Sequence, residues 1–129
     1  MASGTLHDET FEAENDLSSK QFYAVEAGAA VGQVDIADAN ADVILGILQN
    51  KPKAGEAARV CTISGLITKA VVNGSGTNIA YGDPLQVANG GKLIKCVTDK
   101  NYYVARALAA STADGDIIDV MLERGYFAA

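Results

Sequence analysis

The chain has 129 residues, of which 49% are apolar and 20% are charged, and its formal net charge is −6. This is ordinary for a globular protein of one domain that builds its own core. The acidity argues against nucleic acid or an anionic membrane as the main partner, because both attract basic surfaces. No apolar run approaches the roughly 20 residues of a membrane-spanning helix, and the acidic N-terminus does not look like a secretory signal. We therefore expect the protein to mature in a cytoplasm.

The first nineteen residues differ from the rest of the chain. They carry five acidic side chains and no Lys or Arg, and their apolar residues Leu6, Phe11 and Leu17 are isolated. A segment with neither a period of two nor a helical stripe cannot bury enough surface to order itself. We predict that residues 1–19 form an acidic extended arm, flexible or ordered only on a partner, and that residues 20–129 form the body.

From residue 20 onward, short apolar runs alternate with turns rich in Gly, Asn and Asp. This pattern is typical of a small β-barrel or sandwich. The predicted strands occupy residues 20–27, 33–37, 42–50, 58–64, 66–72, 85–88, 92–98, 102–110 and 117–123. Gly46, inside one of these runs, indicates a bulge or a close approach of two backbones.

Two Ala-rich segments, residues 36–48 and 104–111, are candidates for a short helix, although both also suit strands. The predicted fold class is therefore all-β, a small barrel-like domain of eight to ten short strands with at most a short helix.

The glycine-rich stretch over residues 80–93 could hold a ligand or simply reverse the chain. Pro84 favours an extended conformation at Asp83, and Asn89-Gly90 followed by Gly91 suits a hairpin turn. No nucleophile or base accompanies Asp83. We interpret the stretch as scaffolding that pairs residues 85–88 with residues 92–97.

No motif predicts catalysis or a metal. Residues 38–49 lack the glycine and the final acid of a calcium loop, and Gly74–Gly76 lacks the third glycine of a dinucleotide loop. The sole histidine, His7, lies in the arm with nothing to fix it as a base. Cys61 and Cys96 stand in apolar runs and are expected to be buried thiols. We predict that the protein is not an enzyme and has no cofactor and no metal.

Lys69 is the one candidate for covalent modification. Its context resembles that of lipoyl-carrier domains, small β-barrels that present one lysine at a hairpin tip. The apolar neighbours here instead place Lys69 in the middle of a strand, projecting to solvent. A carrier domain modified on Lys69 remains the alternative function, and it predicts a cofactor adduct in the intact mass.

The order of the pieces resembles the small capsid decoration, or cement, proteins of tailed bacteriophages. The resemblance covers roughly residues 20–122 and rests on turn glycines and strand starts in "GILQNKPKAGEAARVCTISGLITKAVV", "YGDPLQVANGGKLIK" and "VARALAASTADGDIIDVML". Ala105 departs from the pattern, since glycine is common there, and the long acidic arm is a second departure.

The resemblance implies a compact, tulip-like β-barrel that often forms homotrimers. Such proteins bind the major capsid protein on the outside of the expanded head, at three-fold or quasi-three-fold positions, and brace the shell against the pressure of packaged DNA. The virion surface is therefore the expected location, after assembly in the host cytoplasm. The arm is expected to make many of the contacts to the shell.

Eleven residues are the candidates for contact with the shell or a neighbouring subunit. In the arm and just after it, these are the apolar anchors Leu6, Phe11, Leu17 and Phe22 and the charge partners Asp8, Glu9 and Glu12. Near the C-terminus they are the aromatic residues Tyr102, Tyr103, Tyr126 and Phe127. Core packing is the alternative for each strand aromatic.

Overall fold

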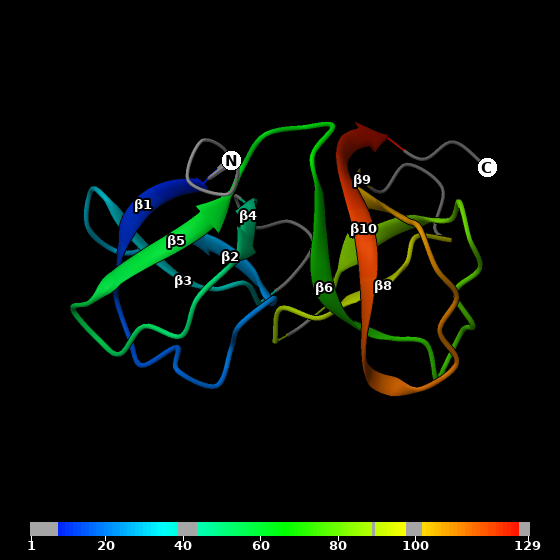
Figure 1. Ribbon diagram of the computed structural model, residues 1–129, viewed down its shortest axis with the longest axis horizontal. Helices are drawn as coiled ribbons and strands as arrows, with labels where there is room; N and C mark the ends of the chain where they lie inside the picture. The colour runs from blue at the N-terminus through cyan, green and yellow to red at the C-terminus, as the bar shows by residue number, and fades with distance from the viewer. Residues whose placement is uncertain (1–7, 39–43, 89, 98–101, 127–129) are drawn as a thin grey trace, which may run out of the picture.

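The computed structural model describes residues 8–38, 44–88, 90–97 and 102–126. These residues form ten β-strands and no helix (Figure 1), so the all-β prediction is confirmed. Nine of the strands lie within or overlap the predicted ranges. The described parts of both Ala-rich segments contain strands and no helix.

The first half of the chain forms a closed five-stranded barrel in the order β1-β3-β2-β4-β5. Its strands are β1 (Asp8–Ala13), β2 (Ala24–Ala27), β3 (Gln33–Ile36), β4 (Ile44–Leu48) and β5 (Ala57–Cys61). The first strand runs parallel to β3 and antiparallel to β5, which closes the barrel.

The second half forms another closed barrel in the order β10-β6-β8-β7-β9. Its strands are β6 (Ile67–Asn73), β7 (Pro84–Val87), β8 (Leu93–Lys95), β9 (Tyr102–Ala107) and β10 (Asp114–Tyr126). Here β6 runs parallel to β8 and antiparallel to β10. The predicted pairing of residues 85–88 with 92–97 is confirmed as the antiparallel pair β7 and β8.

The two barrels have the same connectivity. In each, the first strand pairs parallel with the third and antiparallel with the fifth, and the second strand lies between the third and the fourth. The sequence predicted one small barrel in residues 20–129, whereas the chain forms two barrels side by side, and the first of them includes β1 (Figure 1). The chain is therefore a structural tandem repeat.

The prediction of a separate arm is wrong from Asp8 onward, because β1 is an integral strand of the first barrel. Backbone pairs join Asp8 to Cys61 and Glu12 to Ala57. After the strand, Leu17 is only 2% exposed and packs in the core of this barrel. The sequence pattern did not reveal β1, because its inward apolar residues alternate with polar ones over only a few positions.

Gly46 lies where two backbones approach closely, as the sequence indicated. Next to Gly46, the pairing of β2 with β4 shifts by one residue, because Val25 pairs with Gly46 but Glu26 pairs with Ile44. A Cβ atom at Gly46 would overlap the carbonyl oxygen of Cys61 and would lie 2.9 Å from Cγ1 of Val60. Only glycine fits between β4 and β5 at this point.

The two barrels share one apolar layer and are joined by hydrogen bonds. The largest core cluster combines first-barrel residues such as Ala24 and Ile47 with second-barrel residues such as Leu85. The backbone amide of Ala24 donates to Gly91 over 2.9 Å, and that of Val71 donates to Phe22 over 3.0 Å.

Two side chains of the second barrel add to this joint. Thr68 accepts a hydrogen bond from the amide of Gln49 at 2.8 Å. The guanidinium of Arg124 donates to the carbonyl oxygens of Ile44 and Leu45 at 2.8 and 2.9 Å. The barrels therefore hold one another in a defined orientation.

The interpretation of the glycine-rich stretch as scaffolding agrees with its contacts. Asp83 accepts a hydrogen bond from the backbone amide of Ala80 at 2.8 Å and forms an ion pair with Lys95 at 3.5 Å. Its backbone amide donates in turn to the Ala80 carbonyl. These bonds close the turn that leads into β7.

We predict that Gly46→Ala lowers the free energy of unfolding by about 1–3 kcal/mol or more, because the methyl group must displace the backbone of β5. Chemical denaturation monitored by circular dichroism measures the change. Gly76→Ala is the matched control, since no atom lies within 4 Å of a Cβ atom there, and it should change stability by less than about 0.5 kcal/mol. Equal effects of the two substitutions would contradict the close-approach argument.

Candidate partner-binding surface

The acidic residues predicted as partner contacts line the first barrel. Glu9 and Glu12 are exposed on β1, and Glu12 accepts a hydrogen bond from the Gln33 amide at 3.3 Å. Asp8 is placed by its backbone pairing in the same strand. Leu6 lies outside the described residues. The exposed carboxylates of Glu9 and Glu12 are thus held on a strand of the first barrel.

The apolar residues predicted as anchors serve the protein's own core. Phe11 packs against the interior of the first barrel, where Leu17 is buried. Phe22 packs against the layer between the barrels, with a left-handed φ of 72° that is rare for a bulky residue. Leu17 is therefore not available to a partner, and Phe11 and Phe22 are mostly committed to packing.

The tyrosines lie where β9 begins and β10 ends. Tyr102 is 63% exposed, and its backbone pairs with that of Tyr126. Tyr103 is half-buried, and its ring occupies the space above Gly125, where a Cβ atom would overlap the ring. Phe127 lies outside the described residues. Of the predicted aromatic contacts, the structure shows an exposed side chain at Tyr102.

An ion pair stands beside Tyr103 on the outer surface of the second barrel. The Arg106 guanidinium donates to the Glu123 carboxylate at 2.8 and 3.2 Å and to the Gly82 carbonyl at 2.7 Å. It also lies 5.6 Å from the centre of the Tyr103 ring. The hydrogen bond from Arg106 holds the pKa of Glu123 below its ordinary value, and Tyr103 supports it. The same contact with Glu123 raises the pKa of Arg106.

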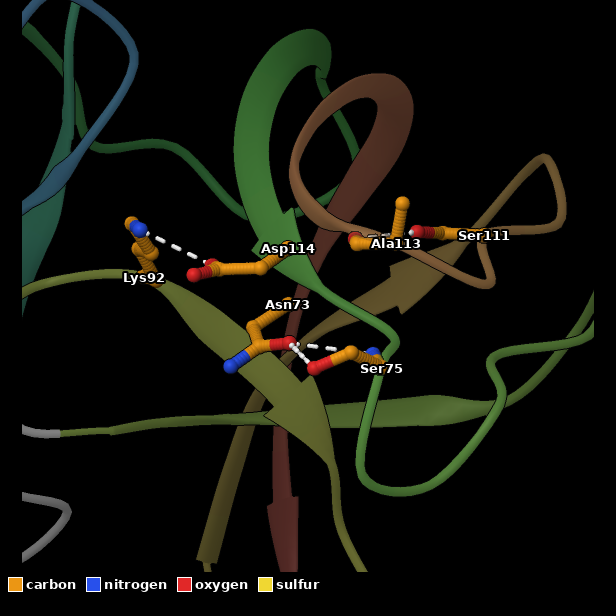
Figure 2. Close-up of polar contacts among 6 residues, drawn as sticks. All are labelled: Asn73, Ser75, Lys92, Ser111, Ala113 and Asp114. Atoms are coloured by element: carbon orange, nitrogen blue, oxygen red, sulfur yellow. Dashed lines mark hydrogen bonds and ion pairs between the residues drawn. The ribbon is translucent and has the colours of Figure 1, made fainter.

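Polar contacts fasten the opposite end of the second barrel (Figure 2). Lys92 pairs with Asp114 at 2.8 Å, and this contact raises the pKa of Lys92. The Asn73 side chain accepts hydrogen bonds from the backbone and hydroxyl of Ser75, and Ser111 donates to the Ala113 carbonyl. The Lys92 pair joins the turn before β8 to the start of β10, and the other contacts lie within the turn after β6 and the turn before β10.

A cavity of about 230 Å³ opens beside this end of the barrel. It is lined by Asn73, Gly76, Thr77, Gln86, Ile94, Lys95 and Val97. Its lining pairs amide and hydroxyl groups with two aliphatic side chains and one lysine, and contains neither a carboxylate nor a histidine that could act as a base.

Lys69 lies in the middle of β6, as the sequence predicted, with its Nζ atom 3.4 Å from Asp119 of β10. This position differs from the hairpin tip at which a carrier domain presents its lysine. Among the described residues, Asp, Glu, Cys and His side chains form no group of three that could hold a metal ion. Cys61 and Cys96 are buried thiols, and burial raises the pKa of the Cys96 thiol.

Charge and exposed apolar surface are divided between the barrels. Residues 8–61 carry ten acidic and four basic side chains, whereas residues 62–126 carry six of each, so the whole net charge of −6 belongs to the first barrel. Of the seven large apolar side chains exposed in the described residues, six follow residue 62. They are Ile63, Ile67, Tyr81, Val97, Tyr102 and Ile117.

The sequence analysis singled out Tyr102 but not the other five. The only sequence signal that could have identified these five residues is an apolar side chain at an outward strand position or in a turn. The sequence alone does not say which positions point outward.

Comparisons with known proteins decide the family. A family model described as phage cement protein matches residues 1–122. This chain belongs to the phage cement protein family. The resemblance to decoration proteins is thereby confirmed. No curated protein matches the chain.

One solved structure extends the likeness to the fold. The crystal structure of the head fiber gp8.5 N base of bacteriophage phi29 aligns with a TM-score of 0.62 at 15% identity. The alignment covers 95% of this chain and 98% of that one. At this identity the likeness concerns the fold, and it spans both barrels.

Within the described residues, no helix has the length and apolarity to cross a membrane.

The ion pair of Arg106 with Glu123 predicts a defined response to acid. Because the pKa of Glu123 is lowered from 4.5 in the folded state, its contribution to stability is present above that value and is lost as the pH falls through the lowered pKa. We expect Glu123→Gln to reduce the loss of stability on acidification, as measured by urea unfolding from neutral pH to about pH 3. The effect is small, because both side chains are about one-third exposed.

Glu9→Gln, which removes an exposed carboxylate from the first barrel, controls for the change in net charge. If both variants show the same pH dependence, the ion pair is not the cause.

Proposed function

We propose that this chain is a capsid decoration protein that binds the outside of the expanded phage head. Its partner is the major capsid protein, and its sites are the three-fold and quasi-three-fold positions of the shell. It acts by binding, without catalysis, and braces the shell against the pressure of packaged DNA. The observation that carries the proposal is the match to the phage cement family over residues 1–122.

The architecture supports a binding role. Both barrels are closed, so the described strands offer no free edge to which a partner could add a strand. Contact must then use side chains and turns on a rigid surface, which lose little conformational entropy on binding. The acidic first barrel also discourages binding to the packaged nucleic acid.

A homotrimer is the assembly that we propose. Three linked copies convert weak contacts into strong binding, because after the first contact the others form within one complex. The exposed Tyr102, next to Tyr103 and Tyr126, is a candidate for contact between copies or with the shell. Large amphipathic rings of this kind are common in interfaces.

Cosedimentation with heads of the phage that encodes the chain tests this function. We expect saturable binding to expanded heads, with a stoichiometry that matches the three-fold positions, and no binding to unexpanded heads. Bound heads should also resist heating or DNA pressure better than bare ones. Absence of binding to expanded heads would overturn the proposal.

The segment before β1 is proposed as an additional contact, with Leu6 as its apolar anchor. Since β1 begins at Asp8, a chain that starts at this residue keeps all ten strands. We expect it to fold but to bind heads roughly ten- to a hundredfold more weakly, the cost of exposing one leucine that was buried in a contact. A chain that starts at Lys20 is not a suitable test, because it lacks β1 and opens the first barrel. Undiminished binding by the chain from Asp8 would show that residues 1–7 are dispensable.

A further inference from the structure

The closing strands of the second barrel, β6 and β10, carry apolar side chains on their outer face. The outward residues are Ile67 and Lys69 of β6 and Ile117, Asp119 and Met121 of β10, here called the β6–β10 face. Ile67 is 65% and Ile117 54% exposed. Between them Lys69 lies opposite Asp119 and pairs with it at 3.4 Å. The face is therefore apolar toward both ends and neutral at its centre.

The inward residues of the same strands fill the core of the barrel. Thr68, Ala70, Ile118 and Val120 are buried and alternate with the outward residues. A strand with one face in water ordinarily places polar side chains on that face. The isoleucines on the outer face are thus not explained by the core.

The first barrel supplies an internal control for this argument. Its closing strands, β1 and β5, have the same connectivity, and their outward pairs are Thr10 with Arg59 and Glu12 with Ala57. These positions carry polar or small side chains in an equally closed barrel. Closure therefore does not require large apolar residues outside, and the difference points to contact with a partner.

The location of the face narrows the choice of partner. Val71, the next outward residue of β6, is only 6% exposed, and its backbone amide bonds to Phe22 of the first barrel. Figure 1 shows β6 between β10 and the first barrel. Whatever covers the face therefore lies next to a barrel of net charge −6. A second copy docked through the same face would add another barrel of equal charge, which is repulsive.

We propose that the β6–β10 face docks on the head shell, on an apolar and nearly uncharged patch of the shell protein. This rests on the function proposed above and adds the surface that performs it. Ile67 and Ile117 are the apolar anchors. Lys69 and Asp119 neutralise one another at the centre of the face. A shell patch that covers this centre therefore needs no charged group to compensate for it. The acidic first barrel then lies beside the contact and does not form it.

The test is cosedimentation of the full chain with expanded heads, comparing wild type with Ile67→Thr/Ile117→Thr. Threonine keeps the β-branched shape that strands favour but removes the apolar surface. We expect the double variant to bind at least about tenfold more weakly. Two control variants should bind like wild type: Val31→Thr, which alters an exposed apolar residue of the first barrel, and Ile67→Val/Ile117→Val. Circular dichroism and the unfolding midpoint verify that each variant is folded. If the double variant does not fold, the two single threonine variants are compared instead, each with part of the loss expected.

The outcomes separate the surface from the function. Equal binding of wild type and the folded threonine variants would overturn this inference and leave the proposed function standing. Failure of wild type to bind would overturn the function, and the docking proposal with it. Light scattering after size exclusion gives the mass in solution. If the threonine variants reduce the mass of a wild-type oligomer, the face holds a second copy, and docking on the shell is wrong.

Discussion

The structure depends on the pairing of the first strand of each repeat with its last. The pairing of β1 with β5 and of β6 with β10 turns two sheets into barrels and removes the exposed edges of the described strands. In the second barrel, β10 continues beyond this pairing, and a register shift between Leu122 and Gly125 interrupts its ladder with β9. In this stretch Arg124 reaches the backbone of the first barrel. One long strand, β10, thus both closes the second barrel and contributes to the joint between the barrels.

The two barrels have similar interiors but different outer surfaces. Both barrels fill their interiors with small and branched apolar residues, and they share an apolar layer in which Ala24 and Ile47 meet Leu85. Their outer surfaces have diverged, with the net charge on the first and most of the exposed apolar side chains on the second. A rigid pair of barrels can therefore present an acidic surface and an apolar one side by side in a defined orientation. Two surfaces of this kind suit the proposed role on a shell filled with nucleic acid.

The prediction of the family, which rested on turn residues and the order of the runs along the chain, is confirmed. The roles assigned to single side chains rested on weaker signals. The turn at Asp83 and the hairpin of β7 with β8 follow from local chemistry that tertiary packing rarely changes. In contrast, Phe11 and Leu17 are apolar residues in an acidic context, and they could anchor either a partner or the chain's own core. Their burial was decided by Ala58 and Val60 of β5, which lie far from them in the sequence.

The sequence by itself determined the all-β class, the positions of nine strands and the close approach at Gly46, because β-branched runs, turn glycines and backbone sterics act over a few residues. It did not reveal β1, the division into two barrels or the outward direction of Ile67 and Ile117. Those features arise from pairings between distant strands, such as β1 with β3 and β6 with β8. A one-residue change of register would turn every side chain of a strand to the other face, so only the tertiary structure decides which isoleucines lie in the core and which point outward.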